Sequence, residues 1–322
     1  MQGQIKLYKK LLIIIIPVIV LILFFEVRAR GLENGFTLKK KVIENKISDI
    51  NILILGSSHG YFSINPDILN HNSVNLAYYS QDLYYDNLLF EKYKNNLKNL
   101  KCIIVSVSYF SLWYDLNEAH EKWRKYFYKE YFNLPARSSY SLSDYTDIKT
   151  YSFAFLYRIE NTLLGMINPK MFSFGTKMNS LGWNTDTTGN VLDSTEATIL
   201  RGKERVEFTN TLVIRKNFES NISILGNFAK YLKENNIKLV FVTTPVSFAY
   251  AKYIDKNIYI EFTEKAGSFA DGKDVFYLNY FYDKRFCMTD YYDYDHLKGS
   301  GANLFSRILK DTLENLKITD KQ

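Results

Sequence analysis

The sequence predicts an α/β fold in which helices cover both faces of a parallel sheet, giving three layers, with a partly helical insertion and an N-terminal transmembrane helix. Three observations carry this prediction. Short apolar runs typical of buried strands alternate with amphipathic helical segments in 51–109 and 217–316. An aromatic-rich stretch at about 110–215 interrupts the alternation, and a long apolar run precedes all of it. We therefore expect an anchor at 1–30 and one α/β domain at 31–322.

Composition narrows the class of protein. With 322 residues, of which 47% are hydrophobic and 23% charged, the chain can fold into one large domain or two smaller ones rather than stay disordered. The low content of 5 prolines and 15 glycines excludes a low-complexity architecture. The net charge of +7 is mild and the basic residues are dispersed, so we expect no nucleic-acid partner.

The apolar run extends from Leu11 to Phe25 without a polar side chain. A spanning helix needs about 20 residues, and Lys9, Lys10 and Arg28 can lengthen this one by reaching the interface. A buried core helix and a cleaved signal peptide are the alternatives, although the residues after Phe25 form a poor cleavage site. We expect an uncleaved anchor and a single-pass membrane protein. Because only a short tail precedes the run, we expect the α/β domain outside the cytoplasm, on the periplasmic or cell-surface side.

Periodicity gives the order of elements in the α/β domain. Branched apolar runs predict strands at 51–56, 73–77, 101–109, 237–245 and 275–279, the second being the weakest. Apolar residues at helical spacing predict helices at 82–100, 217–235 and 301–316. Strands that alternate with helices of this length imply a parallel sheet, whose ligands bind beyond the carboxyl ends of the strands.

The stretch at about 110–215 is too long for a simple crossover loop. We expect an inserted subdomain there, partly helical at 151–167. Its many aromatic side chains have two interpretations: they form the core of the insertion, or they form a platform on which a sugar stacks.

Two short motifs carry candidate chemistry. The first is Gly56-Ser-Ser-His59, at the end of the first predicted strand, where a serine on a tight turn is exposed to a substrate. The second is Asp293-Tyr-Asp-His296, just before the last predicted helix. An aspartate three residues before a histidine can hold the imidazole while its other nitrogen takes a proton from a serine hydroxyl. His296 is therefore the best-placed base.

Each motif also has an explanation that involves no catalysis. The serines fit a turn or a helix cap, and Asp293 and Asp295 fit a solvated acidic loop, a cap or a divalent metal site. The other histidines are poorer candidates for the base: His59 is the immediate neighbour of the serine, His71 lies in a polar turn and His120 lies in the insertion.

The two cysteines, Cys102 and Cys287, do not make a disulfide framework. Cys102 lies in an apolar run, which favours a small buried side chain. A disulfide between the two is the alternative.

In this order and setting, the two motifs resemble those of the SGNH/GDSL hydrolase superfamily, over most of the α/β domain outside the insertion. The resemblance implies a flavodoxin-like three-layer sheet, Ser58 as nucleophile, His296 as base and Asp293 as its partner, and no metal or cofactor. Ser57 stands where the family usually has an aspartate. The segment from Asp295 to Ala302 is similar to the membrane-anchored branch that includes alginate O-acetylation and teichoic acid D-alanylation proteins.

The resemblance also implies an oxyanion site made by the backbone N–H groups of Ser58 and Ser80. Ser80 stands where the family's second-strand turn has a glycine, and the family's oxyanion asparagine has no counterpart after the third predicted strand. One lost oxyanion donor can lower a rate by ~10²–10³. Asn75, Ser108 and Tyr109, which lie in the second and third predicted strands, are expected to touch the substrate.

The resemblance implies a membrane-anchored serine esterase or O-acyltransferase that uses Ser58, His296 and Asp293 on an acylated cell-surface polysaccharide or another ester. It implies a membrane-bound acyltransferase as a further partner. One alternative is a catalytically inactive protein that binds or assembles a surface polymer. Another is a structural or partner-binding protein in which the motifs are accidental, and it would leave Ser58 and His296 too far apart to share a hydrogen bond.

Overall fold

The computed structural model describes residues 2–69, 72–137, 146–157, 159–168, 174–185, 192 and 195–319, so His71 lies outside the described residues. The chain divides into two compact units. The first is Met1–Thr37 with Ser138–Thr176, and the second is Leu38–Arg137 with Lys177–Gln322. The parallel sheet and all the predicted site residues belong to the second unit.

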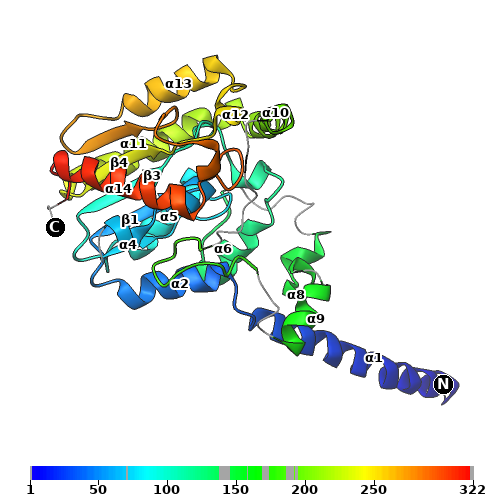
Figure 1. Ribbon diagram of the computed structural model, residues 1–322. Helices are drawn as coiled ribbons and strands as arrows, with labels where there is room; N and C mark the ends of the chain where they lie inside the picture. Colours follow the sequence, from blue (N-terminus) through cyan, green and yellow to red (C-terminus); the bar gives the residue numbers. More distant parts are fainter. Residues whose placement is uncertain are drawn as a thin grey trace. The chain divides into compact units, whose positions relative to one another are not determined.

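The second unit is built on a five-stranded parallel sheet (Figure 1). The strands are β1 (Ile52–Gly56), β2 (Ser73–Asn75), β3 (Cys102–Ser106), β4 (Lys238–Thr243) and β5 (Val275–Asn279). Their order across the sheet is β2-β1-β3-β4-β5, and every neighbouring pair is parallel. β1 and β3 are buried along their whole length, as expected for a sheet covered on both faces. This is the flavodoxin-like order, which confirms the predicted fold class.

Helices cover both faces of this sheet (Figure 1). On one face, α5 (Leu83–Tyr93) packs on α11 (Phe218–Glu234), with the ring centroids of Phe90 and Phe228 5.1 Å apart. Next to them, α13 (Lys256–Gly267) packs on β5. On the other face, α14 (Gly299–Asn315) packs on α3 (Ser58–Ser63) and α4 (Pro66–Leu69). These are the three layers that the sequence predicts.

The chain between β3 and β4 carries most of the remaining elements. In the second unit these are η1 (Leu116–Glu118), α6 (Arg124–Phe132), α10 (Glu196–Asn210) and η4 (Arg215–Asn217); in the first they are η2 (Ile148–Thr150), α8 (Phe153–Leu156) and α9 (Ile159–Ile167). The stretch predicted as one insertion is thus divided between the units. Trp113 and Tyr128 are buried and stack on Phe218 and Tyr85, which lie outside the predicted insertion, so these aromatic side chains belong to the core of the second unit.

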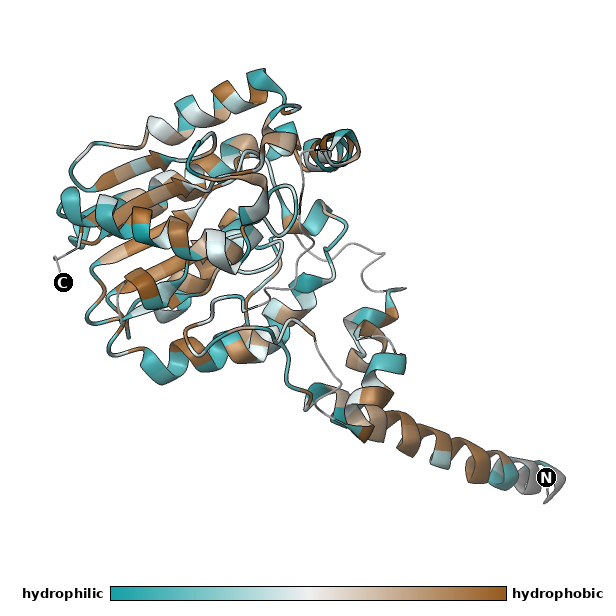
Figure 2. Cartoon of the chain, viewed as in Figure 1, coloured by the Kyte–Doolittle hydropathy of each residue, from teal (hydrophilic) through white to brown (hydrophobic). Residues whose placement is uncertain are grey.

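The described residues also include the helices α2 (Gly35–Lys46), α12 (Phe248–Ala251) and η5 (Met288–Asp290). In the first unit, α1 (Gln2–Arg30) includes the segment Tyr8–Arg30, with a mean hydropathy of 2.9 (Figure 2). Its apolar side chains are exposed, which argues against a buried core helix. The helix is long and apolar enough to cross a membrane, and a signal sequence would look the same.

One predicted helix and one predicted strand extend several residues beyond the observed elements. The helix predicted at 82–100 ends at Tyr93, because Asn95 and Asn96 favour turns over helix. The strand predicted at 101–109 ends at Ser106, and the N–H of Ser108 then donates to Oγ of Ser111 rather than to a neighbouring strand. Both cysteines are free thiols, Cys102 buried and Cys287 exposed, so the alternative of a disulfide between them is not supported.

Candidate active site

The turn from β1 into α3 places Ser58. Gly56 ends β1 with φ +122°, and a Cβ there would lie 2.6 Å from the carbonyl oxygen of Ser106. The buried Asp86 accepts a 2.8 Å hydrogen bond from the Gly56 N–H, and Ser57 caps α3 with its side chain. Ser58 is the first residue of α3 and is half-buried. It therefore stands at the carboxyl end of β1, where parallel sheets bind ligands.

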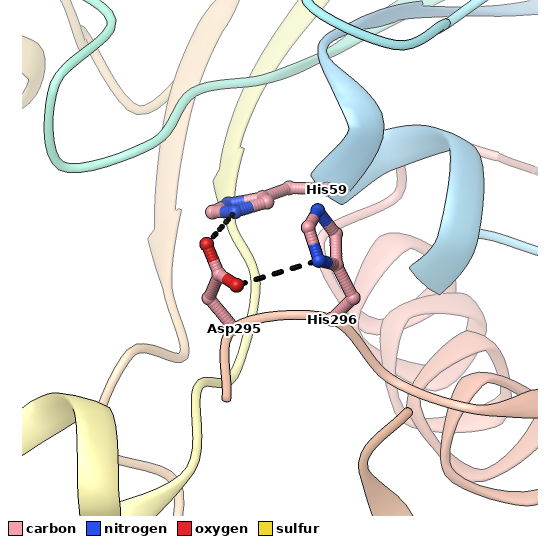
Figure 3. A group of neighbouring side chains, drawn as sticks. All are labelled: His59, Asp295 and His296. Carbon is pink, nitrogen blue, oxygen red and sulfur yellow. Dashed lines mark hydrogen bonds and ion pairs between the residues drawn. The ribbon is translucent and has the colours of Figure 1, made fainter. Parts of the chain in front are cut away.

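The loop before α14 carries His296 to the start of α3, where its ring lies 4.9 Å from that of His59, centroid to centroid (Figure 3). Oδ1 of Asp293 accepts hydrogen bonds from the N–H groups of Asp295 (3.1 Å) and His296 (2.9 Å). These bonds fold the four-residue motif into a turn, and both carboxylate oxygens of Asp293 lie 2.9 Å from Nδ1 of His296.

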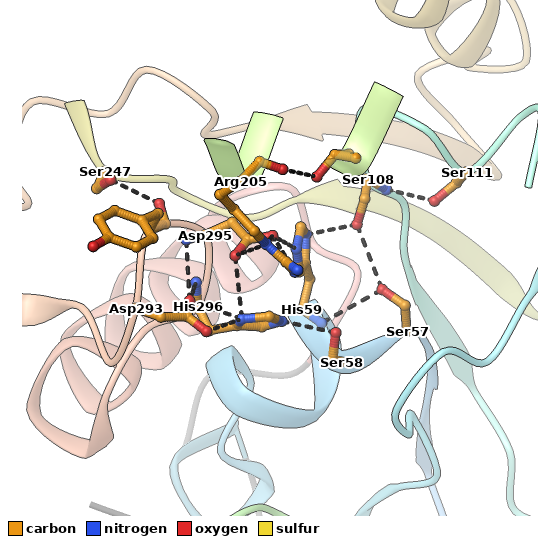
Figure 4. Close-up of polar contacts among 12 residues, drawn as sticks. Ser57, Ser58, His59, Ser108, Ser111, Arg205, Ser247, Asp293, Asp295 and His296 are labelled. Carbon is orange, nitrogen blue, oxygen red and sulfur yellow. Dashed lines mark hydrogen bonds and ion pairs between the residues drawn. The ribbon is translucent and has the colours of Figure 1, made fainter. Parts of the chain in front are cut away.

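The other ring nitrogen of His296, Nε2, lies 2.7 Å from Oγ of Ser58 (Figure 4). When Nδ1–H donates to Asp293, Nε2 is free to accept the hydroxyl proton of Ser58. The structure thus brings together the three residues that the motifs single out. A short Ser58–His296 contact is the opposite of what an accidental pair of motifs would give.

The surroundings of His296 favour its use as a base. Burial alone would lower the pKa of the imidazole, but the carboxylates of Asp293 and Asp295 outweigh burial and raise the pKa above its ordinary value of 6.5. Nδ1 lies 3.4 Å from Oδ1 of Asp295 in addition to its contacts with Asp293. A more basic imidazole accepts a hydroxyl proton more readily.

The two predicted oxyanion donors border the same cavity as Ser58. Ser80 has φ +54°, so a serine adopts the left-handed conformation that favours glycine. Its hydroxyl donates to the carboxylate of Glu121, a residue of the predicted insertion, and this contact fixes the turn that contains Ser80. Within the described ranges, neither the Ser58 N–H nor the Ser80 N–H donates to a protein acceptor. Both donors therefore remain available to a substrate oxygen.

The cavity beside Ser58 has a volume of about 300 Å³. Its polar side includes Ser57, Ser58, Ser80, Glu121, Arg205, Asp293 and His296. Its aromatic side consists of Tyr79, Phe110, Tyr114 and Phe208, of which the last three come from the predicted insertion. The insertion therefore supplies part of the site, although most of its aromatic residues are core.

The predicted substrate contacts lie elsewhere. Asn75 is fully buried: its Nδ2 donates to the carbonyls of Gly60 (3.0 Å) and Ile64 (2.9 Å), and its Oδ1 accepts from the Ala77 N–H (2.9 Å). Because these bonds tie β2 to α3, Asn75 has a structural place and does not border the cavity. The expected contact of Asn75 with the substrate is therefore not supported.

Ser108 and Tyr109 are also buried and do not border the cavity. Oγ of Ser108 lies 2.7 Å from Nδ1 of His59. The hydroxyl of Tyr109 donates to Oδ1 of Asn210 (2.7 Å), and burial raises its pKa to about 12. Tyr109 belongs to the core and Ser108 to a polar network behind the site, so the expected substrate contacts of both are not supported.

Three residues of the site were missed by the sequence interpretation: His59, Asp295 and Arg205 (Figure 4). Oδ2 of Asp295 lies 3.2 Å from Nε2 of His59 and accepts a 2.8 Å bond from Nη2 of Arg205. His59 and Asp295 lie inside the two motifs, which was the available signal. Arg205 belongs to α10, and no local pattern links that helix to the motifs.

The cluster of His59, Asp295 and His296 also tests the metal alternative (Figure 3). One ligand atom from each lies within 4.8 Å of the others. However, Asp295 already forms an ion pair with the guanidinium of Arg205, and this positive charge would repel a divalent cation at the same carboxylate. His59 and His296 each use both ring nitrogens on protein partners. This donor set does not fit a cation.

No protein-family model matches the chain. No curated protein matches it either. Among solved structures, one match is the crystal structure of a GDSL-like lipase from Bacteroides thetaiotaomicron, at 11% identity and TM-score 0.39, covering 87% of this chain and 98% of that one. Another is the crystal structure of a candidate acylhydrolase from Bacteroides fragilis, at 10% identity and TM-score 0.40, covering 88% of this chain and 99% of that one.

Proposed function

We propose that the chain is an SGNH-type serine hydrolase or O-acyltransferase that acts on ester bonds. The observation that carries the proposal is the 2.7 Å contact between Oγ of Ser58 and Nε2 of His296, with Asp293 on the other ring nitrogen. This arrangement suits a serine nucleophile, its base and the group that orients the base.

In the proposed reaction, Oγ of Ser58 attacks the ester carbonyl and its proton passes to Nε2 of His296. The N–H groups of Ser58 and Ser80 stabilise the negative oxygen of the tetrahedral intermediate. The carbon–oxygen bond to the leaving alcohol breaks, and His296 gives that alcohol the proton. Water, or the hydroxyl of an acceptor, then attacks the acyl–Ser58 ester, again with His296 as base. Water makes the protein an esterase, and an acceptor hydroxyl makes it an O-acyltransferase.

The substrate in this proposal is an acylated cell-surface polysaccharide, and α1 anchors the protein in the membrane as a single-pass helix with the α/β domain outside the cytoplasm. The long apolar α1 supports the anchor. A polymer at the cell surface would lie within reach of an anchored enzyme, and a membrane-bound acyltransferase would be a suitable acyl donor. Alkaline extraction of membranes tests the anchor: an integral protein stays in the pellet, whereas a cleaved precursor releases a soluble product.

The test of the chemistry uses the full chain in detergent with a fluorophosphonate probe, read by intact mass. We expect one adduct in the wild type, none in Ser58→Ala and an adduct in Ser57→Ala. Ser57 is the matched control because it lies in the same turn but caps α3 instead of contacting His296. An adduct that survives Ser58→Ala would overturn the assignment of the nucleophile.

A catalytically inactive polymer-binding protein is the second candidate. The observation in its favour is the segment after β3, which offers Ser108, a buried residue bonded to His59, where the family has an oxyanion asparagine. Absence of any adduct in folded wild-type protein would favour this candidate. Retention of the protein on acylated polysaccharide but not on the deacylated polymer would then test the binding.

A further inference from the structure

A second polar network lies behind His296, centred on Asp295 (Figures 3 and 4). Asp295 is fully buried, and Arg205 binds it with Nε at 2.9 Å from Oδ1 and Nη2 at 2.8 Å from Oδ2. His59 lies against the same carboxylate at 3.2 Å, and Nδ1 of His296 lies 3.4 Å from Oδ1. One buried carboxylate is therefore shared by an arginine and two histidines.

The charges in this network follow from its geometry. Burial alone would raise the pKa of Asp295, but Arg205 and His296 outweigh burial and hold that pKa well below its usual range, so Asp295 is ionised. Burial lowers the pKa of His59, which leaves its ring neutral. Nε2–H of His59 then donates to Asp295, and Nδ1 accepts from Ser108. Arg205 is thus the cation that compensates Asp295.

We propose that the charges of the Arg205–Asp295 pair set the pH at which His296 becomes available as a base. This inference rests on the proposed function. Asp293 and Asp295 both face Nδ1 of His296, and both favour the imidazolium. The positive charge of Arg205 offsets part of the rise that Asp295 causes in the pKa of His296. The imidazole therefore remains neutral down to a lower pH, and in the neutral form it can accept the proton of Ser58.

Other charged groups near His296 do not replace this pair. From α3, His59 is neutral, as argued above. Across the cavity, Glu121 is compensated by Arg124 at 2.7 Å, and His120 is exposed. Of the charged groups on the described elements around His296, Arg205 is the cation that contacts a carboxylate lying against the ring.

The test is the pH dependence of fluorophosphonate labelling of the full chain in detergent, from about pH 5 to 9, because the acid limb of such a profile reports the base of the free enzyme. Arg205→Gln should move the acid limb to higher pH by about one unit, since Asp295 then acts on His296 uncompensated. Asp295→Asn should move it to lower pH. Arg205→Lys, which keeps the charge, should restore a profile close to that of the wild type.

The double variant Arg205→Gln with Asp295→Asn separates electrostatics from structure. Because Arg205 also acts directly on His296 and lowers its pKa, the two charge effects should add, so the double variant should lie between Arg205→Gln and Asp295→Asn. Arg201→Gln is the matched control, because Arg201 is an exposed residue one turn earlier on α10. Its profile should coincide with that of the wild type. Coinciding profiles for Arg205→Gln and the wild type would overturn the inference.

A second readout does not depend on activity. NMR titration of histidine-labelled full chain follows the His296 ring directly, and a His296→Gln variant assigns its signal among the 4 histidines. The pKa of His296 should rise in Arg205→Gln and fall in Asp295→Asn. If the pKa of His296 shifts as expected in the two variants but the wild-type protein takes no adduct, the proposed catalysis fails and the electrostatic role of the pair stands. If Arg205→Gln does not fold, Arg205→Lys, Asp295→Asn and the double variant still decide the matter.

Discussion

The N–H of Gly56 donates a 2.8 Å hydrogen bond to Oδ1 of Asp86, so a buried carboxyl group on α5 holds the residue that ends β1. The same oxygen accepts from Nε2 of Gln81 at 2.6 Å. Burial outweighs these bonds and raises the pKa of Asp86 to about 7. The position of Ser58, two residues after Gly56, therefore depends on a carboxyl group that is poorly stabilised in its charged form.

Replacement of Asp86 by alanine should lower the free energy of unfolding by about 1–3 kcal/mol, because it leaves the buried Gly56 N–H without an acceptor. It should also slow the labelling of Ser58. Asp86→Asn keeps an oxygen acceptor and should lose less stability. Denaturant unfolding of the full chain in detergent measures the first effect. An Asp86→Ala protein as stable as Asp86→Asn would contradict this account.

Asp86 also predicts a pH dependence of stability. Its folded pKa is raised above the ordinary value of 3.8, so its contribution to stability is fully present below that value and is lost as the pH rises through about 7. Asp86→Asn removes this titration. The difference in free energy of unfolding between Asp86→Asn and the wild type should therefore shift in favour of the variant from pH ~5 to pH ~8. A difference that stays constant over this interval would refute the raised pKa.

Lys39 holds the segment that leads from β2 to Ser80. Its buried ammonium donates to the carbonyls of Asn75 (2.8 Å), Ala77 (2.6 Å) and Gly182 (2.6 Å). Lys39→Met should cost about 1–3 kcal/mol of unfolding free energy, because several buried carbonyls lose a donor, and it should slow labelling of Ser58. Lys40→Met, one position along α2, is the control and should change neither quantity. Equal effects of the two variants would show that Lys39 has no special role.

The sequence predicts those parts of this molecule that local patterns control. The strand predicted at 275–279 coincides with β5, a short run of branched and aromatic residues, and the helix predicted at 301–316 begins only two residues later than α14, whose apolar residues recur at helical spacing. Ser58 and His296 could be paired because each follows or precedes a recognisable element at the same edge of a parallel sheet. Arg205 could not, because no motif or pattern near it in the sequence indicates its contact with Asp295.

The two cysteines should differ in reactivity. Burial raises the pKa of the Cys102 thiol to about 12, whereas Cys287 is exposed. A maleimide should therefore add once to the folded full chain and twice after denaturation, as read by intact mass. Cys287→Ser should abolish the addition to the folded protein and Cys102→Ser should not. Two additions to the folded chain would show that Cys102 is accessible.

Ser80 gives the sharpest test of the oxyanion site, because its proposed donor is the backbone N–H and not the side chain. Ser80→Gly and Ser80→Ala remove the hydroxyl that contacts Glu121 but keep the N–H, so both should retain labelling of Ser58. Glycine should also relieve the left-handed conformation, at φ +54°.

Ser80→Pro removes the N–H and should lower the labelling rate by ~10²–10³, the usual loss for one oxyanion donor. Because proline cannot adopt a positive φ, its unfolding free energy must be compared with that of Ser80→Ala, so that a general loss of structure is recognised. If Ser80→Gly and Ser80→Ala lose as much rate as Ser80→Pro while remaining folded, then the hydroxyl and its contact with Glu121 are what the site needs. The left-handed serine would in that case be a hydrogen-bonding residue, and the oxyanion would depend on Ser58 alone.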